Sequence, residues 1–473
     1  MKQTLFKLLA VLFAFALIAA ACGDDEEETG DTTTEDGDAA EEGAADEEDA
    51  AEEDAAEEDA AEEDAAEGDD AAAGGGDLAG TVVTILGPET GEEAAGFVEA
   101  FEPFTAETGI EIQYTGSRDA TTEMNLAVEG GSPPDLGVIP QPGRIQQFAA
   151  DGAIVPIPQS TLDAVAGDYN PFWFELGQVG DEFYGMPNKG DVKSLVWYSP
   201  ATFEANGYEI PETWDELEAL SEQMKTDGIP PWCVGIGSGD ATGWPFTDWM
   251  EDVMLRLHGP DVYDAWVSNE LPFNAPEVAE VVEFVSDIWF EEGNVLGGRD
   301  IIAQTGFQEA GLGILDGSCG LHRQANFYAA QFVDAGATIG EDVDVFYLPT
   351  ISDEFGQVVL GAGTHVVAFA DRPEVLAVLE YIGTAQYADA RIAADKGGFL
   401  SPNTAHDTSA YSAALDTTLA DILVSADPFR FDASDLMPGE VGSGEWWSSG
   451  TDYVSGSIDL ETFLDNVQNA WPT

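Results

Sequence analysis

Residues 81–114, TVVTILGPETGEEAAGFVEAFEPFTAETGIEIQY, decide the fold of this chain. The stretch opens with a β-branched strand at 81–86 and closes with an alternating strand at 110–114. Between them, Phe97, Phe101 and Phe104 recur at helical spacing, so a helix over 92–107 buries one face. A strand, a helix and a second strand at this spacing predict parallel strands joined by a right-handed crossover.

The next segment repeats this pattern. Residues 121–129 are expected to form a helix that GGSPPD at 130–135 ends, and LGVI at 136–139 forms a third strand. Three parallel strands predict an α/β sheet whose ligand site lies beyond the carboxyl ends of the strands. The residues expected to face this cleft are therefore the loops at 87–91 and 117–119, and Gln141.

A second informative stretch, PWCVGIGSGDATGWPFTDWMEDVMLR at 231–256, combines a glycine-rich turn with three tryptophans and leads into an amphipathic helix. Trp232, Trp244 and Trp249 stand close to acidic side chains in this stretch. Aromatic faces beside polar groups suit a site that binds one ligand through both. The alternative is that these tryptophans are core residues, and spacing alone leaves both interpretations open.

The remainder of the chain extends the α/β pattern and indicates more than one domain. Thr213 and Glu216 form a capping box at the start of a helix, and residues 275–290 form a helix with a valine-rich face. Further elements are expected as strands at 194–198, 343–348 and 360–369 and as a long helix at 375–394. At 473 residues the chain exceeds the usual size of a single core, so two lobes or domains are expected.

The charge of the chain argues against several classes of partner. The formal net charge is −79 at pH 7, and 28 of the 93 acidic residues lie in residues 23–77. Nucleic acid and anionic lipid both bind clustered Lys and Arg, so neither is expected as an electrostatic partner. The folded part is also acidic, which fits either a salt-rich environment or a surface that stays soluble by charge repulsion.

The N-terminus is typical of an exported protein. Residues 1–21 combine two lysines with an apolar run and are expected to be a signal peptide. The sequence AAAC at 19–22 resembles the lipobox of bacterial lipoproteins, although Ala19 stands where leucine is more usual. Lipidation of Cys22 would make residues 22–77, with their AAEED repeats, a disordered acidic tether on the outer face of the cell membrane. An ordinary signal peptide cut near the same alanines is the alternative.

Seven short phrases, taken together, carry a family resemblance over residues 78–471. They are FEPFTAETGI, GGSPPDLGVIPQPG, GYEIPETWDEL, SGDATGWPFTDW, FQEAGLGILDGSC, HRQANF and GGFLSPN. The combination resembles the extracellular solute-binding proteins, family 1, of ATP-binding-cassette (ABC) sugar importers. The pairing of PQPG with ATGWP and HRQA resembles the branch of that family assigned to α-glucosides.

The resemblance implies an α/β, two-lobed periplasmic-binding-protein-like fold of type II, with the ligand cleft between the lobes. Residues 78–192 with 365–415 are expected to form lobe 1, and residues 193–364 with 416–473 to form lobe 2. The implied function is capture of a carbohydrate, an α-glucoside or short oligosaccharide, for delivery to the membrane permease subunits of an ABC importer. We expect a monomer without a cofactor, closing about hinges near 189–197 and 360–367.

Two cysteines remain after Cys22. Cys233 and Cys319 are a candidate disulfide, because an exported chain with an even pair of cysteines commonly joins them. The bond would close a loop of 86 residues and, on the chain-entropy model, stabilise the fold by roughly 4 to 5 kcal/mol. Two buried thiols are the alternative.

A sugar site needs aromatic rings against C–H faces and planar polar groups that hold neighbouring hydroxyls. Trp244 and Trp447 are expected as the ring platforms, with Trp446 behind them. The residues expected to bind hydroxyl groups are Asp119, Gln141, Lys189, Asp191, Asp248 and Arg323. The alternatives are a core position for Trp446, a helix cap for Asp248 and a salt bridge within the lobe for Arg323.

Two other functions are weighed against sugar binding. An exported glycoside hydrolase needs two carboxylates across a sugar, and a chain this acidic contains such pairs in any case. The chain has no G-x-S-x-G, H-E-x-x-H or G-x-x-x-x-G-K motif, and its four histidines are dispersed, so neither catalysis nor a metal site is expected. The other alternative keeps the fold but binds a cation such as a polyamine in an acidic, tryptophan-lined cleft.

Overall fold

The computed structural model describes residues 78–394 and 396–472. The expected signal peptide, the lipidation site Cys22 and the acidic tether lie outside the described residues. Within them the strands form a six-stranded sheet, a three-stranded sheet and a two-stranded hairpin. The hairpin joins β4 (Gln178–Val179) and β5 (Glu182–Phe183). No helix of the described residues is both long enough and apolar enough to span a membrane.

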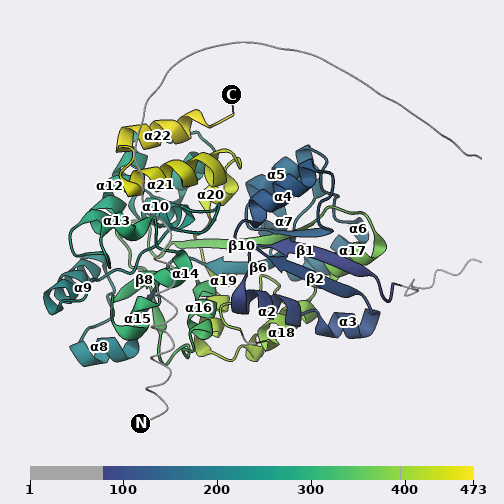
Figure 1. Cartoon of the computed structure of the whole chain (residues 1–473), viewed down its shortest axis with the longest axis horizontal. Coiled ribbons are helices and arrows are strands. Elements are labelled where there is room, and N and C mark those ends of the chain that lie inside the picture. The colour runs from purple at the N-terminus through teal and green to yellow at the C-terminus, as the bar shows by residue number, and fades with distance from the viewer. Residues whose placement is uncertain (1–77, 395, 473) are drawn as a thin grey trace, which may run out of the picture. The chain divides into compact units, whose positions relative to one another are not determined.

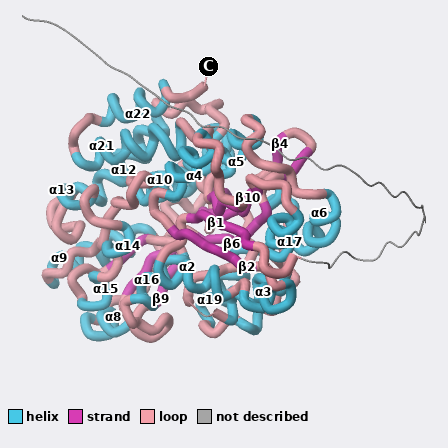
Figure 2. The backbone as a smooth tube through the Cα atoms, turned by 45° about the vertical axis from the view of Figure 1, so that its right-hand side comes forward, coloured by secondary structure: helices cyan, strands magenta, loops and turns pink. Residues whose placement is uncertain are grey.

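The six-stranded sheet begins as the sequence predicts. β1 (Val82–Gly87) pairs in parallel with β2 (Glu111–Gly116) on one side and with β3 (Leu136–Ile139) on the other. α4 (Ala120–Glu129) connects β2 to β3. The strands lie between α4 and α5 (Pro142–Ala150) on one side and α2 (Gly91–Glu99) and α3 (Glu102–Thr108) on the other (Figures 1 and 2). The predicted parallel α/β arrangement is therefore confirmed.

Three more strands complete this sheet. β10 (Val359–Ala368) is antiparallel to β3 and to β6 (Met186–Val192), and β11 (Phe429–Phe431) pairs in parallel with the start of β10. Every residue of β6 and β10 is buried. These two strands therefore form the centre of the described part of the chain, and Figure 1 shows β10 running from the helices near α10 (Trp244–Leu257) toward β1.

Two helices predicted as single elements are each broken in two. The predicted helix over 92–107 is α2 (Gly91–Glu99) followed by α3 (Glu102–Thr108), although Phe97, Phe101 and Phe104 are all buried as expected. Pro103 lies at the start of α3, where its missing N–H and its ring end the preceding helix. The predicted helix over 375–394 is likewise α17 (Pro373–Ile382) and α18 (Ala385–Ala393), because the side chain of Thr384 caps a new helix.

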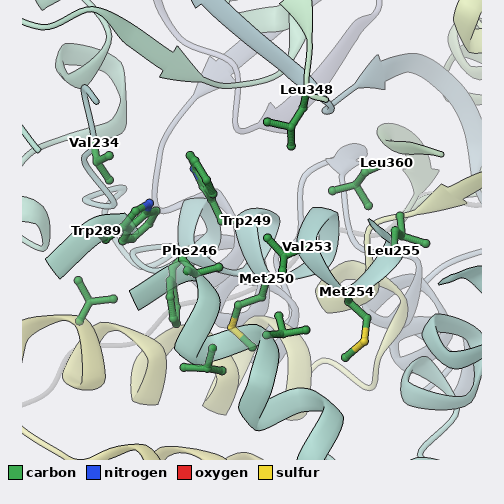
Figure 3. Packing of buried hydrophobic residues seen from close by; sticks show 14 of the residues in the cluster. Val234, Phe246, Trp249, Met250, Val253, Met254, Leu255, Trp289, Leu348 and Leu360 are labelled. Carbon is green, nitrogen blue, oxygen red and sulfur yellow. The ribbon is translucent and has the colours of Figure 1, made fainter. Parts of the chain in front are cut away.

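A three-stranded sheet forms the second sheet-based core. β7 (Leu195–Tyr198) pairs antiparallel with both β8 (Leu321–Arg323) and β9 (Asp344–Tyr347). α10 (Trp244–Leu257) packs in this core against α12 (Pro276–Phe290), and Figure 3 shows Phe246, Trp249 and Met250 of α10 beside Trp289 of α12. α9 (Trp214–Asp227) begins with the capping box that Thr213 and Glu216 predict.

The chain passes between the two cores through short segments. β6 belongs to the six-stranded sheet and β7 to the three-stranded sheet, with only Lys193 and Ser194 between them. On β10, Leu360 packs in the core of the three-stranded sheet and Val366 in the core of the six-stranded sheet. The lobe boundaries stay a prediction. The remaining helices are α6 (Gln159–Val165), α7 (Pro171–Glu175), α8 (Pro200–Asn206), α11 (Gly259–Val267), α13 (Arg299–Ile302), α14 (Phe307–Ala310), α15 (Gly313–Asp316), α16 (Ala329–Asp334), α19 (Ala414–Ser425), α20 (Ala433–Leu436), α21 (Trp447–Ser455) and α22 (Leu460–Asn469).

The predicted disulfide is confirmed. Cys233 and Cys319 are bonded, with their Cα atoms 5.5 Å apart. Both are buried in a cluster that includes Phe307 and Tyr328, and Trp244 packs against the same cluster. The bond therefore fastens the aromatic stretch at 231–256 to the segment that leads into β8.

Candidate functional site

A cavity lies at the edge of the six-stranded sheet where the parallel strands end. It encloses about 870 Å³ of empty space, part of which is open to solvent. Pro88 and Glu89 follow β1, Arg118 follows β2, and Gln141 follows β3. This is the edge at which parallel sheets bind ligands, and these loops form one wall of the cavity.

The opposite wall is aromatic. The rings that line it are Trp244 of α10, Phe307 of α14, Trp447 of α21, and Phe327, which lies just before α16. The ring of Trp244 lies 5.0 Å from that of Phe307 and 6.0 Å from that of Phe327, measured between centroids. Gly243 brings the two tryptophans together, since its φ is +115° and an added β-carbon would lie 2.3 Å from the carbonyl oxygen of Trp447. Rings placed in this way offer a ligand a flat apolar surface.

Lys189 stands between the two walls on β6 and belongs to a compact set of charges. Its Nζ lies 3.0 Å from Glu93 Oε1 and 3.9 Å from Asp191 Oδ2, and Arg118 Nη2 lies 3.6 Å from Glu93 Oε2. Burial acts to raise the pKa of Glu93, but Lys189 and Arg118 outweigh it and hold that pKa below its usual value. Two cations and two carboxylates therefore satisfy one another here, and Lys189 Nζ also lies 5.2 Å from the ring of Phe327.

Lys193, which follows β6, joins a larger buried network. Its Nζ lies 2.7 Å from Asp248 Oδ1 and also contacts Asp432, while it sits 5.5 Å from the ring of Trp244. Arg323 Nη1 lies 3.2 Å from Asp248 Oδ2 and its Nε 2.9 Å from Asp252 Oδ2. Burial raises the pKa of Asp248 to about 6 despite these two cations.

The carboxyl groups of this network are spaced as in a cation site, but a lysine of the chain itself occupies that position. Carboxyl oxygens of Asp248, Glu251 and Asp432 lie within 4.8 Å of one another. Such a set of oxygens suits a cation, and the ammonium group of Lys193 is that cation because it contacts both Asp248 and Asp432. The cluster is therefore an ion-pair network in the wall of the cavity.

Several polar atoms in the first wall lack partners. Glu89 Oε1, Gln141 Oε1 and Arg118 Nε are buried without a hydrogen bond among the described residues. The other carboxylate oxygen of Glu89 accepts a hydrogen bond from the hydroxyl of Tyr114 at 3.0 Å, which fixes the side chain. A buried polar atom without a partner costs about 1–3 kcal/mol, so these atoms favour a ligand that brings hydroxyl groups or water to them.

Five of the nine residues predicted to bind ligand line the cavity. They are Gln141, Lys189, Asp191, Trp244 and Trp447. Asp119 lies beside the lining residue Arg118, and its Oδ1 accepts a hydrogen bond of 3.0 Å from the backbone N–H of Asp240. The strand ends thus predict this part of the site, whereas the ring platforms follow from the tryptophans near the glycine-rich turn.

Besides Asp119, three predicted residues lie outside the lining, for physical reasons. Arg323 is buried and its guanidinium is shared between Asp248 and Asp252, so the salt bridge considered for it is formed. Asp248 lies inside α10, whose N-cap is Gly243, and therefore does not cap the helix. Trp446 is buried in the core, 4.8 Å from the ring of Trp266 and 5.0 Å from that of Phe273.

Other residues of the lining were not singled out from the sequence. Glu89 and Arg118 lie in the loops at 87–91 and 117–119, which the strand-end rule predicted to face the cleft without naming these two residues. Nothing in the local sequence marks the other charged and aromatic residues of the lining, because folding brings them to the cavity from distant segments. They are Glu93, Lys193, Phe307, Phe327, Asp432 and Asp435.

The two walls touch each other at the rim of the cavity. Besides the contact to Asp119, Asp240 Oδ2 accepts a hydrogen bond of 3.3 Å from the backbone N–H of Thr122, and Gln308 Nε2 lies 3.5 Å from Thr90 Oγ1. Gly239 permits this approach, because a β-carbon there would lie 2.2 Å from Asp119 Oδ1. These contacts describe a cavity closed at this rim.

Comparison with known proteins gives a consistent family. A model described as bacterial extracellular solute-binding protein matches residues 87–389. The chain is 40% identical over 400 residues to an osmoprotective compounds-binding protein of Synechocystis sp., covering 84% of this chain and 94% of that relative. It is 38% identical over 410 residues to an alpha-glucosides-binding periplasmic protein of Rhizobium meliloti, covering 84% of this chain and 88% of that relative.

Solved structures share the fold. A bacterial solute receptor described as preferring β-D-galactopyranose matches with a TM-score of 0.71 at 19% identity, over 82% of this chain and 97% of that one. A maltose-bound protein of T. maritima matches with a TM-score of 0.65 at 15% identity, over 82% and 98%. At these identities the likeness shows the fold alone, and it confirms the predicted two-lobed α/β binding-protein fold of type II.

Proposed function

Because the chain belongs to the family of bacterial extracellular solute-binding proteins, we propose that it captures a carbohydrate in the cavity between its two lobes and delivers it to a membrane ABC importer. The observation that carries the proposal is the pairing of an aromatic wall, formed around Trp244, with a wall of buried polar atoms that lack partners. Sugars offer both an apolar C–H face and hydroxyl groups, so one such molecule satisfies both walls.

The class of sugar that we propose is an α-glucoside or short oligosaccharide. The name of the Rhizobium meliloti relative supports it, since that protein is called alpha-glucosides-binding, whereas the name of the Synechocystis relative, osmoprotective compounds-binding, specifies no sugar. Both are similar to this chain over more than four fifths of its length. Trp244 and Trp447 would lie against the sugar ring, and Glu89, Arg118 and Gln141 would hold its hydroxyl groups.

Capture would proceed by closure of the lobes. The contacts of Asp240 with Asp119 and Thr122 at the rim would form as the cavity closes and break as it opens. The segments that cross between the cores, at Lys193–Ser194 and along β10, would absorb the change in backbone angles. A ligand that contacts both walls stabilises the closed form, which would then dock on the permease.

We further propose that Cys22 is lipidated and anchors the protein to the outer face of the cell membrane, with residues 22–77 as a tether. We also propose that the protein acts as a monomer and does not hydrolyse the sugar that it binds. The absence of glucose release from maltose or from a nitrophenyl glucoside is the expected result of that assay.

A cationic ligand such as a polyamine is the second candidate, and one observation favours it. The carboxyl groups of the lining outnumber its cations, five to three. They are Glu89, Glu93, Asp191, Asp432 and Asp435, against Arg118, Lys189 and Lys193. The sugar remains the better proposal because Glu93, Asp191 and Asp432 already pair with lysines of the chain.

The test is thermal unfolding of the purified protein with maltose, trehalose, sucrose or spermidine. A ligand at about 100 times its Kd stabilises the folded state by roughly 2.7 kcal/mol, which raises Tm by several degrees. We expect at least one sugar to raise Tm and spermidine to leave it unchanged. The shift should be clearly smaller in Trp244→Ala and unchanged in Trp471→Ala, a tryptophan outside the cavity. A shift with spermidine alone would instead establish the second candidate.

A further inference from the structure

The network behind Lys193 contains more acidic groups than basic ones. Its members are all at most 5% exposed, and five carboxyl groups face three cations. The carboxyl groups are Asp248, Glu251, Asp252, Asp432 and Asp435, and the cations are Lys193, Arg256 and Arg323. Fully ionised, this buried network would carry two negative charges in excess.

The ion pairs show which carboxyl groups lack a cation. Asp248 pairs with Lys193 and Arg323, Asp252 with Arg323 and Arg256, and Asp432 with Lys193. Glu251 and Asp435 form no ion pair with a lysine or arginine in the part of the chain that the structure describes. The excess of charge therefore falls on these two residues.

A buried carboxylate without a cation is costly, and the neutral acid is the form that burial favours. Burial raises the pKa of Glu251 well above its usual range, and the charges of Asp432 and Asp248 raise it further. Burial likewise raises the pKa of Asp435, followed by the charge of Asp432. Two protons, one on each group, leave three negative charges facing three positive ones.

Hydrogen bonding around Glu251 agrees with this assignment. Glu251 Oε1 accepts a hydrogen bond of 3.0 Å from the backbone N–H of Ser434, whereas its Oε2 is buried without a partner among the described residues. At Asp435, burial and the charge of Asp432 raise the pKa and outweigh the hydrogen bond with the Gln141 side chain, which acts to lower it. A neutral Asp435 has a single O–H, and because Asp435 lines the cavity this donor can face a bound molecule, whereas a carboxylate has no donor.

Asp435 lies on α20, and the elements packed against α20 carry further charged and titratable groups. α10 contributes three carboxyl groups of the network, and Lys193 lies on the segment between β6 and β7. The others are partnered or face elsewhere: Tyr263 of α11 donates to the carbonyl oxygen of Phe431, Asp264 pairs with Arg430, and Arg144 of α5 lies against Gly439. On the following segment stand Glu440, which is exposed, and Glu445, which accepts from Ser449. Lys193 is the cation whose charge acts on Asp435, and it already pairs with Asp248 and Asp432.

We propose that Glu251 and Asp435 are neutral carboxylic acids at neutral pH, and that Asp435 offers the solute a hydrogen-bond donor where a carboxylate would offer only acceptors. The second half rests on the proposed function, since Asp435 lines the cavity assigned to the sugar. A ring oxygen, glycosidic oxygen or hydroxyl oxygen of a sugar is the matching acceptor. Asp435 is therefore a residue that selects solutes, and Glu251, behind the cavity, positions the network.

The first test needs no solute. Infrared spectroscopy of the wild-type protein at pH 7 is expected to show the C=O stretch of buried carboxylic acids, shifted in D2O. Glu251→Gln and Asp435→Asn should each remove part of this band, whereas Glu440→Gln, which alters an exposed carboxylate, should leave it unchanged. A wild-type protein without the band overturns the proposal, whether or not the variants fold.

The second test follows solute binding with pH, using calorimetry with maltose. Wild-type affinity is expected to fall by up to about tenfold per pH unit once Asp435 begins to ionise. Asp435→Asn keeps an N–H donor, so its affinity should stay within about threefold of the wild type at pH 6 and vary little up to pH 9. Weak binding of Asp435→Asn at every pH, with wild-type binding independent of pH, would show an acceptor carboxylate and overturn the role. If maltose does not bind, trehalose or sucrose takes its place in this test. If none of the three sugars binds but the infrared band is present, the proposed function fails and the neutral acids remain.

Discussion

Lys189 and Lys193 stand four residues apart, line the same cavity and each face an aromatic ring, yet their surroundings differ in charge. Around Lys189, the cations Lys189 and Arg118 match the carboxylates Glu93 and Asp191. Around Lys193, five carboxyl groups face three cations. Ion pairing alone therefore completes the first cluster, whereas the second also needs protons. The cavity therefore combines a cluster whose charges stay fixed, around Lys189, with a cluster whose charge responds to pH, around Lys193.

The largest expected effect comes from removing the cation of the second cluster. Lys193→Met leaves Asp248 with Arg323 alone and Asp432 without a cation, so we expect a loss of about 3–5 kcal/mol in the free energy of unfolding. Urea denaturation measures this loss. Lys225→Met, which breaks only surface pairs with Glu222 and Glu291, is the control and should cost at most about 1 kcal/mol. Equal losses in the two variants would remove the distinction between network and surface.

The same substitution in the first cluster should have a smaller effect. Lys189→Met leaves Glu93 with Arg118 and removes a contact of Asp191 that is only 3.9 Å long, while Asp191 Oδ1 keeps its hydrogen bond of 3.2 Å from Asn326. We expect a loss of about 1–3 kcal/mol in the free energy of unfolding, measured in the same urea experiment. A loss greater than that of Lys193→Met would reverse the proposed order of the two clusters.

The rings beside the two lysines should differ in their effect on binding. Trp244→Ala removes the platform that contacts Phe307 and Phe327, and we expect sugar affinity to weaken by about 1–2 kcal/mol. Phe327→Ala removes a smaller ring and should weaken affinity by less. Fluorescence or calorimetric titration of both variants measures the difference. Unchanged affinity in Trp244→Ala would mean that this ring is only a packing residue.

The smallest effect near pH 5 is a gain in stability that grows with pH. A buried carboxyl whose pKa is raised holds its proton more tightly when folded, so the free energy of unfolding falls as pH rises above about 4.3, the usual value for glutamate. Glu251→Gln removes this loss. We expect it to be no more stable than the wild type near pH 4 and about 1 kcal/mol more stable at pH 5, with a gain that grows by about 1.4 kcal/mol per pH unit until the folded-state carboxyl ionises. A variant less stable at pH 8 would indicate that Glu251 is ionised and paired.

The fold could be predicted from the sequence where periodicity is local. β-branched runs and the spacing of Phe97, Phe101 and Phe104 fix strands, helices and their parallel order. The broken helices were missed for different reasons: Pro103 is a visible stop signal inside the apolar pattern, whereas the break at Gly383–Thr384 depends on a side-chain cap. Apolar periodicity reports the buried face and does not report whether the backbone is continuous along it.

The site could be predicted only in part, because charge pairing is a property of the folded chain. Gln141 and Trp244 follow from a strand end and from an aromatic turn. Arg323 and Asp248 were expected to face the ligand, but they form a buried salt bridge with each other. Asp435 lies near the C-terminal end of the chain, and no local sequence pattern predicts that it lines the cavity.

The most direct test of carbohydrate capture is calorimetric titration of the purified chain with maltose, trehalose, sucrose and spermidine under the same conditions. We expect saturable, one-to-one binding of at least one of these neutral sugars, and no heat of binding with spermidine. Tight binding of spermidine together with no binding of any of the sugars would contradict it.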